Sequence, residues 1–406
     1  MDEHTRRLRA VGEHDVSLME LLRRKVHKTI EQVVVEELEA VLGVGPYVRD
    51  DEKRTGYRNG ERKRELTTPN GVVSLTLPRA RLFREDGREE EWRPTVLPRY
   101  KRRMREVDDA ITDVYLSGVN MRRVKIALRP LLKNAPLSKS AVSRILVTVK
   151  GSMESWEERS LAALEPAYVY LDAFAVRVRS AGKVVSQPVM AAVAVLLDGS
   201  KQLLGLEMCS SEGEDGWKGF LDDLTGRGLK RPYLAIIDGC PGLRSAVELK
   251  WPGLPVQRCA VHKLRNLLRK APVHAHEEVR EDFHAIVYAD SLDEAREAWR
   301  AFVRKWSKQC PPVVASLDEG GEELLTFFVF PKEQWRSLRS TNVIERLNGE
   351  FRRRVKTQSS FPREDAAIVL LYGLVATGQV RFRRLEGHDK LVDVAANPPK
   401  LTKKTA

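Results

Sequence analysis

The chain has 406 residues, enough for two or three domains and at least one sizeable hydrophobic core. Its 70 lysines and arginines outnumber its 57 aspartates and glutamates, and the net charge of +13 favours a polyanionic partner, most often a nucleic acid. The four scattered cysteines exclude a disulfide framework, and no segment reads as a signal peptide or a membrane span. We therefore expect a soluble protein of the cytoplasm, associated with the nucleoid and without a membrane partner.

The first 105 residues predict a helix followed by a basic hairpin. Residues 15–43 carry apolar side chains, from Leu18 to Val33, at spacings of three and four, which is typical of an amphipathic helix. The sequence Thr68-Pro69-Asn70-Gly71 predicts a turn between two short strands. We divide this part into a helical segment, 1–45, and a basic hairpin or loop region, 46–105, which either binds phosphates or forms a solvated loop.

Residues 106–160 are predicted to form a helix-turn-helix-like DNA-binding domain. The first helix ends at Leu116, the second spans about 121–132, and the third begins after the cap Ser138. One face of the third helix is apolar, and we predict that Lys139, Ser143 and Arg144 on the other face contact DNA. Such helix pairs also serve as plain packing modules, which remains the alternative.

The centre of the chain predicts a mixed β-sheet. The run 168–176 is apolar on both faces, as in a covered central strand, and Asp172 lies in its middle. Tight turns join it to two further strands, and alternating helices and strands follow, including a strand that ends at Asp238. This order places the first and fourth strands side by side and parallel, in a ribonuclease-H-like arrangement that brings Asp172 and Asp238 together. We predict an α/β catalytic domain over 161–395 with a five-stranded mixed sheet, flanking helices, a helical insertion at about 268–335 and a basic tail, 396–406.

A third acid, Glu345, stands near the start of a helix predicted after residue 342. Three separated carboxylates suit Mg²⁺ or Mn²⁺, and two such ions about 3.5–4 Å apart can promote phosphoryl transfer. Each acid also has a structural alternative: Asp172 paired with Arg177 or a lysine, Asp238 as a turn former or helix cap, and Glu345 as part of a capping box.

The segment Cys259-Ala260-Val261-His262 contains half of a possible zinc site, but no second ligand pair stands at a matching spacing. We interpret Cys259 as a buried small residue. We predict that His262 reaches the phosphate being cut, with a hydrogen-bonded structural histidine as the alternative. No glycine-rich phosphate-binding pattern is present, so ATP is not expected. Further predicted contacts to the DNA backbone are Arg258, Lys263, Arg265, Arg352, Arg353, Arg354 and Lys356.

Taken together, these blocks resemble the Mutator-type transposases of bacterial insertion sequences, which belong to the DDE, ribonuclease-H-like superfamily. The resemblance covers about 57–382 and rests on the surroundings of Asp172, on 212–243, on 256–266 with its Cys-x-x-His signature, and on 341–348 with Phe361-Pro362. Two departures are visible, Cys240-Pro241 after the second aspartate and Arg346 after the glutamate.

The resemblance implies that Asp172, Asp238 and Glu345 form a catalytic, metal-binding triad and that His262 belongs to the same site. It implies an enzyme that binds the terminal inverted repeats of its element, cuts DNA there with the help of divalent ions and transfers the 3′-hydroxyl strand to target DNA. The partners would be double-stranded DNA and a second copy of the chain, in a dimer or larger assembly. A nuclease or resolvase without strand transfer, and a non-catalytic DNA-binding regulator, are the alternatives.

Overall fold

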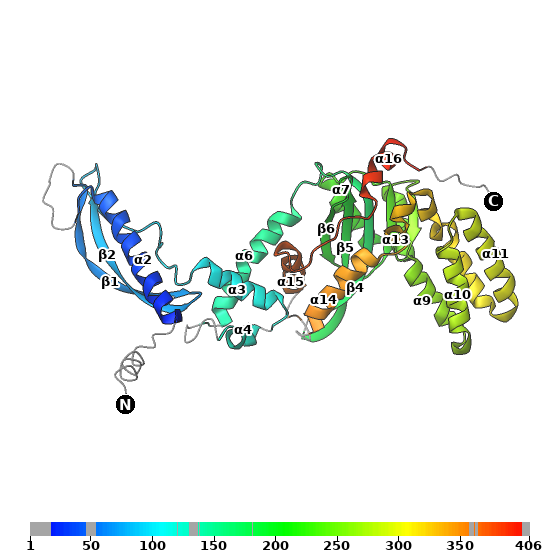
Figure 1. Cartoon of the computed structure of the whole chain (residues 1–406), viewed down its shortest axis with the longest axis horizontal. Helices are drawn as coiled ribbons and strands as arrows, with labels where there is room; N and C mark the ends of the chain where they lie inside the picture. Colours follow the sequence, from blue (N-terminus) through cyan, green and yellow to red (C-terminus); the bar gives the residue numbers. More distant parts are fainter. Residues whose placement is uncertain are drawn as a thin grey trace, which may run out of the picture. The chain divides into compact units, whose positions relative to one another are not determined.

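A computed structural model describes residues 18–45, 54–119, 121–129, 137, 139–180, 182–356, 361 and 364–399. They fall into two compact units, one within Met1–Tyr115 and Val119–Val147 and the other within Leu116–Gly118 and Thr148–Ala406 (Figure 1). The predicted cap Ser138, the end of the second helix near Leu132 and the tail beyond residue 399 lie outside the described residues.

The first unit contains a long helix and a three-stranded antiparallel sheet. Its elements are α2 (Leu18–Leu42), β1 (Gly56–Thr68), β2 (Gly71–Phe83) and β3 (Glu89–Glu91). The predicted hairpin is confirmed, with Thr68 paired to Gly71 at the turn, but both strands are 13 residues long and the third strand was not predicted. Gly71 has φ of +109°, a left-handed conformation that favours glycine.

The helix α2 packs on the sheet with its C-terminal half. Val34, Leu38 and Leu42 are buried in one cluster with apolar residues of β1 and β2. Leu18 and the next two leucines of the predicted stripe are exposed, so the stripe marks the buried face correctly only toward its end. The periodicity specifies a face of the helix, whereas the extent of the sheet decides how much of that face is covered.

The three helices predicted for the next segment are present as α3 (Arg105–Leu116), α4 (Met121–Ala127) and α6 (Lys139–Glu157). Ser143 and Arg144 are exposed on α6, as DNA contact requires. Lys139 begins α6, but its side chain lies outside the described part of the structure.

The second unit is built on a mixed five-stranded sheet in the order β6-β5-β4-β7-β8. The strands are β4 (Pro166–Ser180), β5 (Lys183–Leu196), β6 (Lys201–Met208), β7 (Leu234–Ile237) and β8 (Val256–Arg258). The first three form the predicted antiparallel meander, and β7 and β8 run parallel to β4. The prediction that the first and fourth strands are parallel neighbours is confirmed, and the sheet is compatible with a ribonuclease-H-like core.

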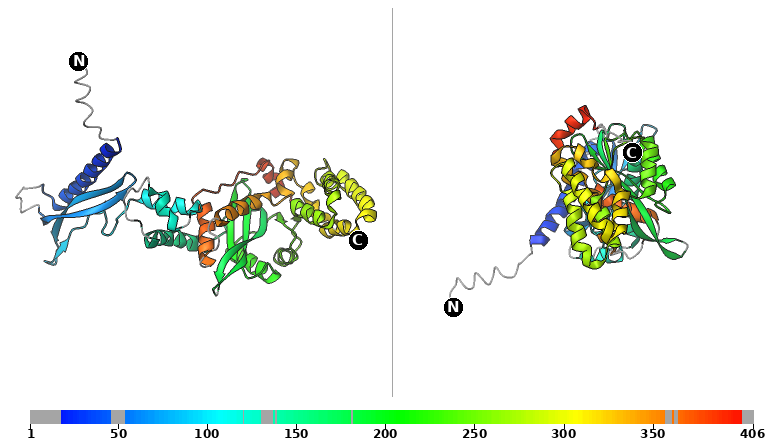
Figure 2. Two further views of the ribbon diagram at one scale, coloured as in Figure 1. Left: turned by 90° about the horizontal axis from the view of Figure 1, so that it is seen from below. Right: turned by 90° about the vertical axis from the view of Figure 1, so that its right-hand side faces the viewer.

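Helices cover the two faces of this sheet (Figure 2). On one face α7 (Glu214–Gly226) and α8 (Pro241–Lys250) bury Trp217 and Phe220 against Leu171 and other apolar residues of the strands. On the other face α14 (Asn342–Lys356) packs on β4, where the rings of Phe174 and Phe351 contact each other in a tilted arrangement with centroids 5.5 Å apart. Because β4 is covered on both sides, the polar side chain of Asp172 in its middle is enclosed.

The residues predicted to form the insertion, about 268–335, are mainly helical, and the described residues between β8 and α14 contain no strand. The helices between β8 and α14 are α9 (Ala260–Lys270), η1 (Val273–Ala275), α10 (His276–Val287), α11 (Leu292–Gln309), α12 (Pro311–Gly320), η2 (Gly321–Leu324), η3 (Thr326–Val329), η4 (Lys332–Gln334) and α13 (Trp335–Leu338). Ser291 caps α11 through its hydroxyl, as predicted, and Cys310 ends that helix. The chain finishes with α15 (Glu364–Ala376), η5 (His388–Lys390) and α16 (Leu391–Ala396).

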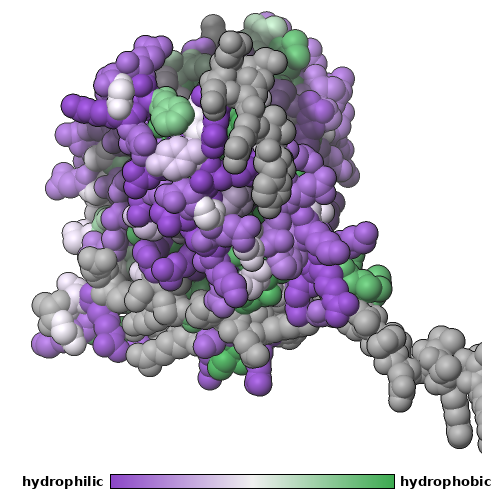
Figure 3. Space-filling model, turned by 90° about the vertical axis from the view of Figure 1, so that its left-hand side faces the viewer, coloured by the Kyte–Doolittle hydropathy of each residue, from purple (hydrophilic) through white to green (hydrophobic). Residues whose placement is uncertain are grey.

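The visible surface agrees with the composition. On the face shown in Figure 3, hydrophilic residues dominate the described surface and hydrophobic residues occur in small separate patches. None of the helices within the described residues is both long and apolar enough to span a bilayer.

Candidate active site

Two aspartates meet where β4 and β7 run side by side. The last pair in this parallel ladder joins Leu171 to Ile237; Asp172 follows Leu171 within β4, and Asp238 follows the last residue of β7. Leu171 and Ile237 both lie in the core under α7 and α8. Because side chains alternate along a strand, Asp172 stands on the opposite face, toward α14. The register of one strand pair therefore brings together residues that are 66 positions apart in the sequence.

Asp172 is 6% exposed and hydrogen-bonded at both carboxylate oxygens. Its Oδ1 accepts from the backbone N–H of Ala173 at 3.0 Å, and its Oδ2 accepts from Nδ2 of Asn348 at 2.8 Å. The alternative pairing with Arg177 is not seen, since Arg177 lies exposed on β4. A buried carboxylate held by neutral donors is an unusual arrangement unless another charge compensates it.

The electrostatics identify the neighbours of this carboxyl group. Burial raises the pKa of Asp172 to about 7, and the negative charges of Asp238 and Glu345 act in the same direction. The positive charge of Arg352 opposes them. All three acids therefore lie close enough to interact, and the like charges make full ionisation costly in the absence of a cation.

Asp238 occupies the turn between β7 and α8. Its Oδ1 accepts from the backbone N–H of Cys240 at 2.9 Å, so the turn-forming role considered for it is real. Gly239 has φ of +99°, and a Cβ there would lie 2.3 Å from the guanidinium of Arg258, so glycine is required at this position. Only one oxygen of Asp238 takes part in the turn, and this leaves the second for another ligand.

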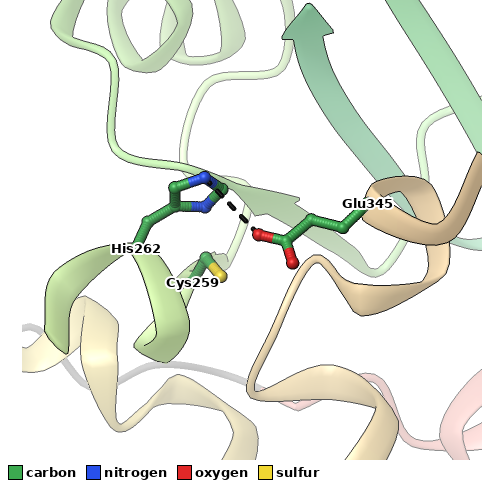
Figure 4. Close-up of side chains that lie close together, drawn as sticks. All are labelled: Cys259, His262 and Glu345. Atoms are coloured by element: carbon green, nitrogen blue, oxygen red, sulfur yellow. Dashed lines mark ion pairs between the residues drawn. The ribbon is translucent and has the colours of Figure 1, made fainter. Parts of the chain in front are cut away.

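Glu345, in the first turn of α14, points at the beginning of α9 (Figure 4). Its Oε1 lies 3.5 Å from Nε2 of His262 and 3.4 Å from a guanidinium nitrogen of Arg265. The carboxylate is thus engaged with another element, which differs from the capping-box alternative.

The Cys-x-x-His segment joins β8 and α9 to the start of α14. The sulfur of Cys259, which is fully buried, accepts from both the backbone N–H and the hydroxyl of Thr341, at 3.3 and 3.2 Å. The same hydroxyl lies 3.5 Å from Nδ1 of His262. Burial raises the pKa of the Cys259 thiol, in agreement with a packed residue rather than a nucleophile.

Ligand atoms of Cys259, His262 and Glu345 lie within 4.8 Å of one another. The spacing of the sequence showed only two possible ligands here, because Glu345 joins them from a helix more than 80 residues away. Glu345 thus lies beside a sulfur and a nitrogen ligand, and its negative charge also acts on Asp172.

The oxygen donors around Asp172 are of the type that Mg²⁺ or Mn²⁺ prefers, whereas the group of potential ligands that lies within 4.8 Å in the described residues is Cys259, His262 and Glu345. Three carboxylates supply hard oxygen ligands, and their mutual repulsion is the condition that a cation relieves. The amide oxygen of Asn348, which is 1% exposed, has no hydrogen-bond partner within the described structure. Asn348 was not among the predicted site residues. It stands three residues after Glu345 on the same helix, a spacing that places both residues on one helical face.

Most of the predicted DNA-contacting cations are accessible. Arg265, Arg352, Arg353 and Lys356 are exposed. Arg353 and Arg354 form ion pairs with Glu350, and the side chain of Arg354 is 16% exposed, so it contributes less surface than predicted.

Arg258 and Lys263 differ from the prediction that they contact DNA. Arg258 is 9% exposed and donates to the carbonyl oxygens of Gly239 and Glu319 and to the carboxylate of Glu319. Lys263 is 2% exposed and donates to Ser316 and to the same Glu319 carboxylate. Arg258 in β8 and Lys263 in α9 both bind α12 through these hydrogen bonds. Because both side chains are buried, they are not accessible to a DNA phosphate.

The chain is similar to known proteins over most of its length. The profile of the family described as "Transposase, Mutator family" matches residues 3–384. The transposase for insertion sequence element ISRM5 of Rhizobium meliloti (strain 1021) is 36% identical over 353 residues, which are 86% of each chain. The transposase for IS1081 of Mycobacterium tuberculosis (strain ATCC 25618 / H37Rv) is 32% identical over 89% of this chain and 85% of its own. The transposase for IS256 in transposon Tn4001 of Staphylococcus aureus is 33% identical over 78% of this chain and 79% of its own. The chain belongs to the Mutator family of transposases.

Proposed function

We propose that this transposase moves an insertion element by metal-dependent DNA cleavage and strand transfer of the DDE type, on a ribonuclease-H-like core. The observation that carries the proposal is the convergence of Asp172, Asp238 and Glu345 from two neighbouring strands and a helix. Their oxygens would hold two Mg²⁺ or Mn²⁺ ions. Ions bound in this way activate the attacking oxygen and stabilise the leaving oxygen of a phosphodiester.

The reaction has two steps. Water attacks the phosphodiester at the end of the element, and the bond from phosphorus to the 3′-oxygen breaks, so that a 3′-hydroxyl and a 5′-phosphate are released. That 3′-hydroxyl then attacks a phosphodiester of target DNA, where a new phosphorus–oxygen bond forms and the target 3′-oxygen leaves. Neither step needs a covalent protein–DNA intermediate, in agreement with the absence of a serine or tyrosine nucleophile from the residues described around the acids.

The surrounding residues position the substrate and the acids. Asn348 orients Asp172 through its hydrogen bond, and the contacts of Thr341 with Cys259 and His262 hold the helix start that carries Glu345. His262 lies beside Glu345, where it can donate to a phosphate oxygen held at the acids. The exposed Arg265 and Arg352 supply positive charge next to Glu345 and Asp172.

Recognition of the element falls to the first unit and to α6. The helices α3, α4 and α6 act in this proposal as a helix-turn-helix-like reader of the terminal inverted repeats, with Lys139, Ser143 and Arg144 as the proposed DNA contacts. Two ends must be brought together before strand transfer, so the working assembly contains at least two copies of the chain. Binding through many phosphate contacts makes the affinity for DNA fall steeply with salt.

A strand-transfer assay tests the proposal. Purified protein is mixed with a duplex that carries a pre-cleaved element end, a supercoiled plasmid and Mn²⁺, and joined products are measured on a gel. We expect joined products with the wild type and with Asp293→Asn, an exposed acid of α11 that serves as the matched control, and none with Asp172→Asn. Hydrolysis without any joining would favour the nuclease alternative. Joining by Asp172→Asn at the wild-type rate would reject the catalytic assignment.

A further inference from the structure

A groove lies beside α14, next to the helix turn that carries Glu345. Its walls are formed by Val343, Arg346 and Glu350 of α14, by Lys201 at the start of β6, and by the segment 379–383 that follows α15. The groove has a volume of about 540 Å³. Three segments that are far apart in the sequence thus form one concave surface in the second unit.

The charge of this groove is predominantly positive. Four cations line it, Lys201, Arg346, Arg381 and Arg383, against the single acid Glu350. Glu350 is engaged by Arg353 and Arg354, one turn further along α14. Within the described residues, none of the four cations forms an ion pair with a carboxylate. Their charges are therefore not neutralised within this part of the protein.

The uncompensated positive charge of the groove affects the ionisation of Lys201. Its ammonium group is half-buried, and its hydrogen bond goes to the backbone carbonyl oxygen of Arg383. Burial lowers the pKa of Lys201 to about 8, and the nearby positive charge of Arg346 acts in the same direction. A cation that has lost part of its hydration and has a like charge beside it is stabilised when an anion enters the groove.

We propose that this groove binds the phosphodiester backbone of the DNA strand that leaves the acid cluster. Arg346 directly follows Glu345 on α14, so a strand held at the acids can continue along the same helix. Lysine and arginine side chains that come from several segments suit phosphates, which carry charge at regular intervals, and such contacts fix the register of the duplex without reading its bases. The inference rests on the proposed function, because it names a further part of the same DNA path.

Salt-dependent binding of the full-length chain tests the groove. Affinity for a labelled duplex that contains an element end is measured between about 0.05 and 0.2 M salt. We expect the double variant Arg346→Gln/Arg383→Gln to lower the slope of log K against log salt by about 1.8, because each lost phosphate contact removes about 0.9. It should weaken binding to element ends and to unrelated duplexes by the same factor, about tenfold or more at 0.15 M salt.

The control variant Arg300→Gln/Arg304→Gln removes the same charge from exposed positions of α11 in the insertion. Its slope should stay near that of the wild type. At the groove itself, Lys201→Arg should retain binding and Lys201→Gln should weaken it, while thermal melting confirms that all variants are folded. Equal slopes for the groove and control variants, or equal affinities for the two Lys201 variants, would overturn the proposal.

Failure of the groove assignment can be distinguished experimentally from failure of the proposed transposition chemistry. Should the groove variants bind normally while Asp172→Asn abolishes joining, the groove assignment fails and the transposition chemistry stands. Should Asp172→Asn join DNA while the groove variants lose their salt slope, the chemistry fails and the DNA path stands.

Discussion

Nδ2 of Asn348 donates a hydrogen bond of 2.8 Å to Oδ2 of Asp172, and both residues are buried. This bond fixes α14 to the middle of β4 across 176 positions of sequence. It means that the helix which presents Glu345 and the strand which presents Asp172 cannot shift independently. The separation of the acids is therefore set by a polar contact inside the protein rather than by a loop.

Two replacements of Asn348 test separately its hydrogen bond to Asp172 and its place beside the expected ion. Asn348→Leu leaves Oδ2 of Asp172 buried without its donor, and we expect the unfolding free energy to fall by about 1–3 kcal/mol. Asn348→Asp adds a fourth carboxylate, so the metal-free protein should lose still more stability and regain a larger share of it with Mn²⁺. Thermal melting with and without Mn²⁺ measures both effects, and an equal response of the two variants to the ion would contradict this view of the site.

The ionisation of Asp172 predicts how stability depends on pH. Its pKa of about 7 in the folded protein lies above the ordinary value of 3.8, so the folded chain binds the proton more tightly than the unfolded chain. The unfolding free energy of the metal-free protein should therefore fall as pH rises from about 4 to about 7, by at most about 4 kcal/mol from this group.

Asp172→Asn removes that ionisable group. Compared with the wild type in the presence of a chelator, the variant should be more stable at pH 8 and show little difference at pH 4. Chemical unfolding at a series of pH values gives the comparison, with Asp293→Asn as the control that follows the wild type. A stability difference that does not change with pH would contradict the burial of an ionisable acid at this position.

Divalent ions should restore the stability that the protein loses when buried Asp172 becomes ionised. Addition of Mg²⁺ or Mn²⁺ at a hundredfold excess over its dissociation constant should stabilise the wild type by about 2.7 kcal/mol for one site. The gain should be larger at pH 8 than at pH 5.5, because the ion competes with the proton for Asp172. Asp172→Asn should show a much smaller gain. Differential scanning fluorimetry across ion concentrations measures it, and an equal gain in both proteins would place the ion elsewhere.

We expect Cys259 to support catalysis indirectly, by holding the start of α14 in place. Cys259→Ala removes the acceptor of the Thr341 N–H and hydroxyl, which lie at the start of α14, and so loosens the turn that carries Glu345. We expect joining activity to fall by about tenfold or more, as is found when a supporting contact of a metal site is lost. Cys259→Ser keeps an acceptor and should retain more activity. Affinity for DNA should change little in either variant, and a loss of affinity equal to the loss of activity would argue for a direct DNA contact.

Lys263 and Arg265 form a contrasting pair two residues apart on α9. Lys263→Gln leaves Glu319 without this partner inside the protein, and we expect a loss of about 1–3 kcal/mol in stability with an unchanged salt slope of DNA binding. Arg265→Gln, at an exposed position, should leave stability nearly unchanged and lower the slope by about 0.9. Melting and binding measurements on the two variants should thus give opposite patterns, and the same pattern in both would refute the assignment.

Much of the second unit follows from local sequence. The apolar run around Asp172, the tight turns and the alternation that ends at Asp238 predict the strand order, because strand length, turn residues and periodicity are local properties. The helix of Ile344, Leu347 and Phe351 was predicted for the same reason. The lengths of β1 and β2 and the buried part of α2 were not, since they depend on what each surface packs against.

Residue types and local patterns along the chain specify which acids are available and the order of strands that makes Asp172 and Asp238 neighbours. The contact of Glu345 with His262, rather than with its own helix terminus, and the hydrogen bond from Asn348 to Asp172 arise from packing between segments that are distant in the sequence. Packing also places Lys263 against Glu319, with which it pairs, and leaves Arg265 exposed. The physical reason is that charge and hydrogen-bonding capacity belong to a residue type, whereas desolvation and partners belong to a place in the fold.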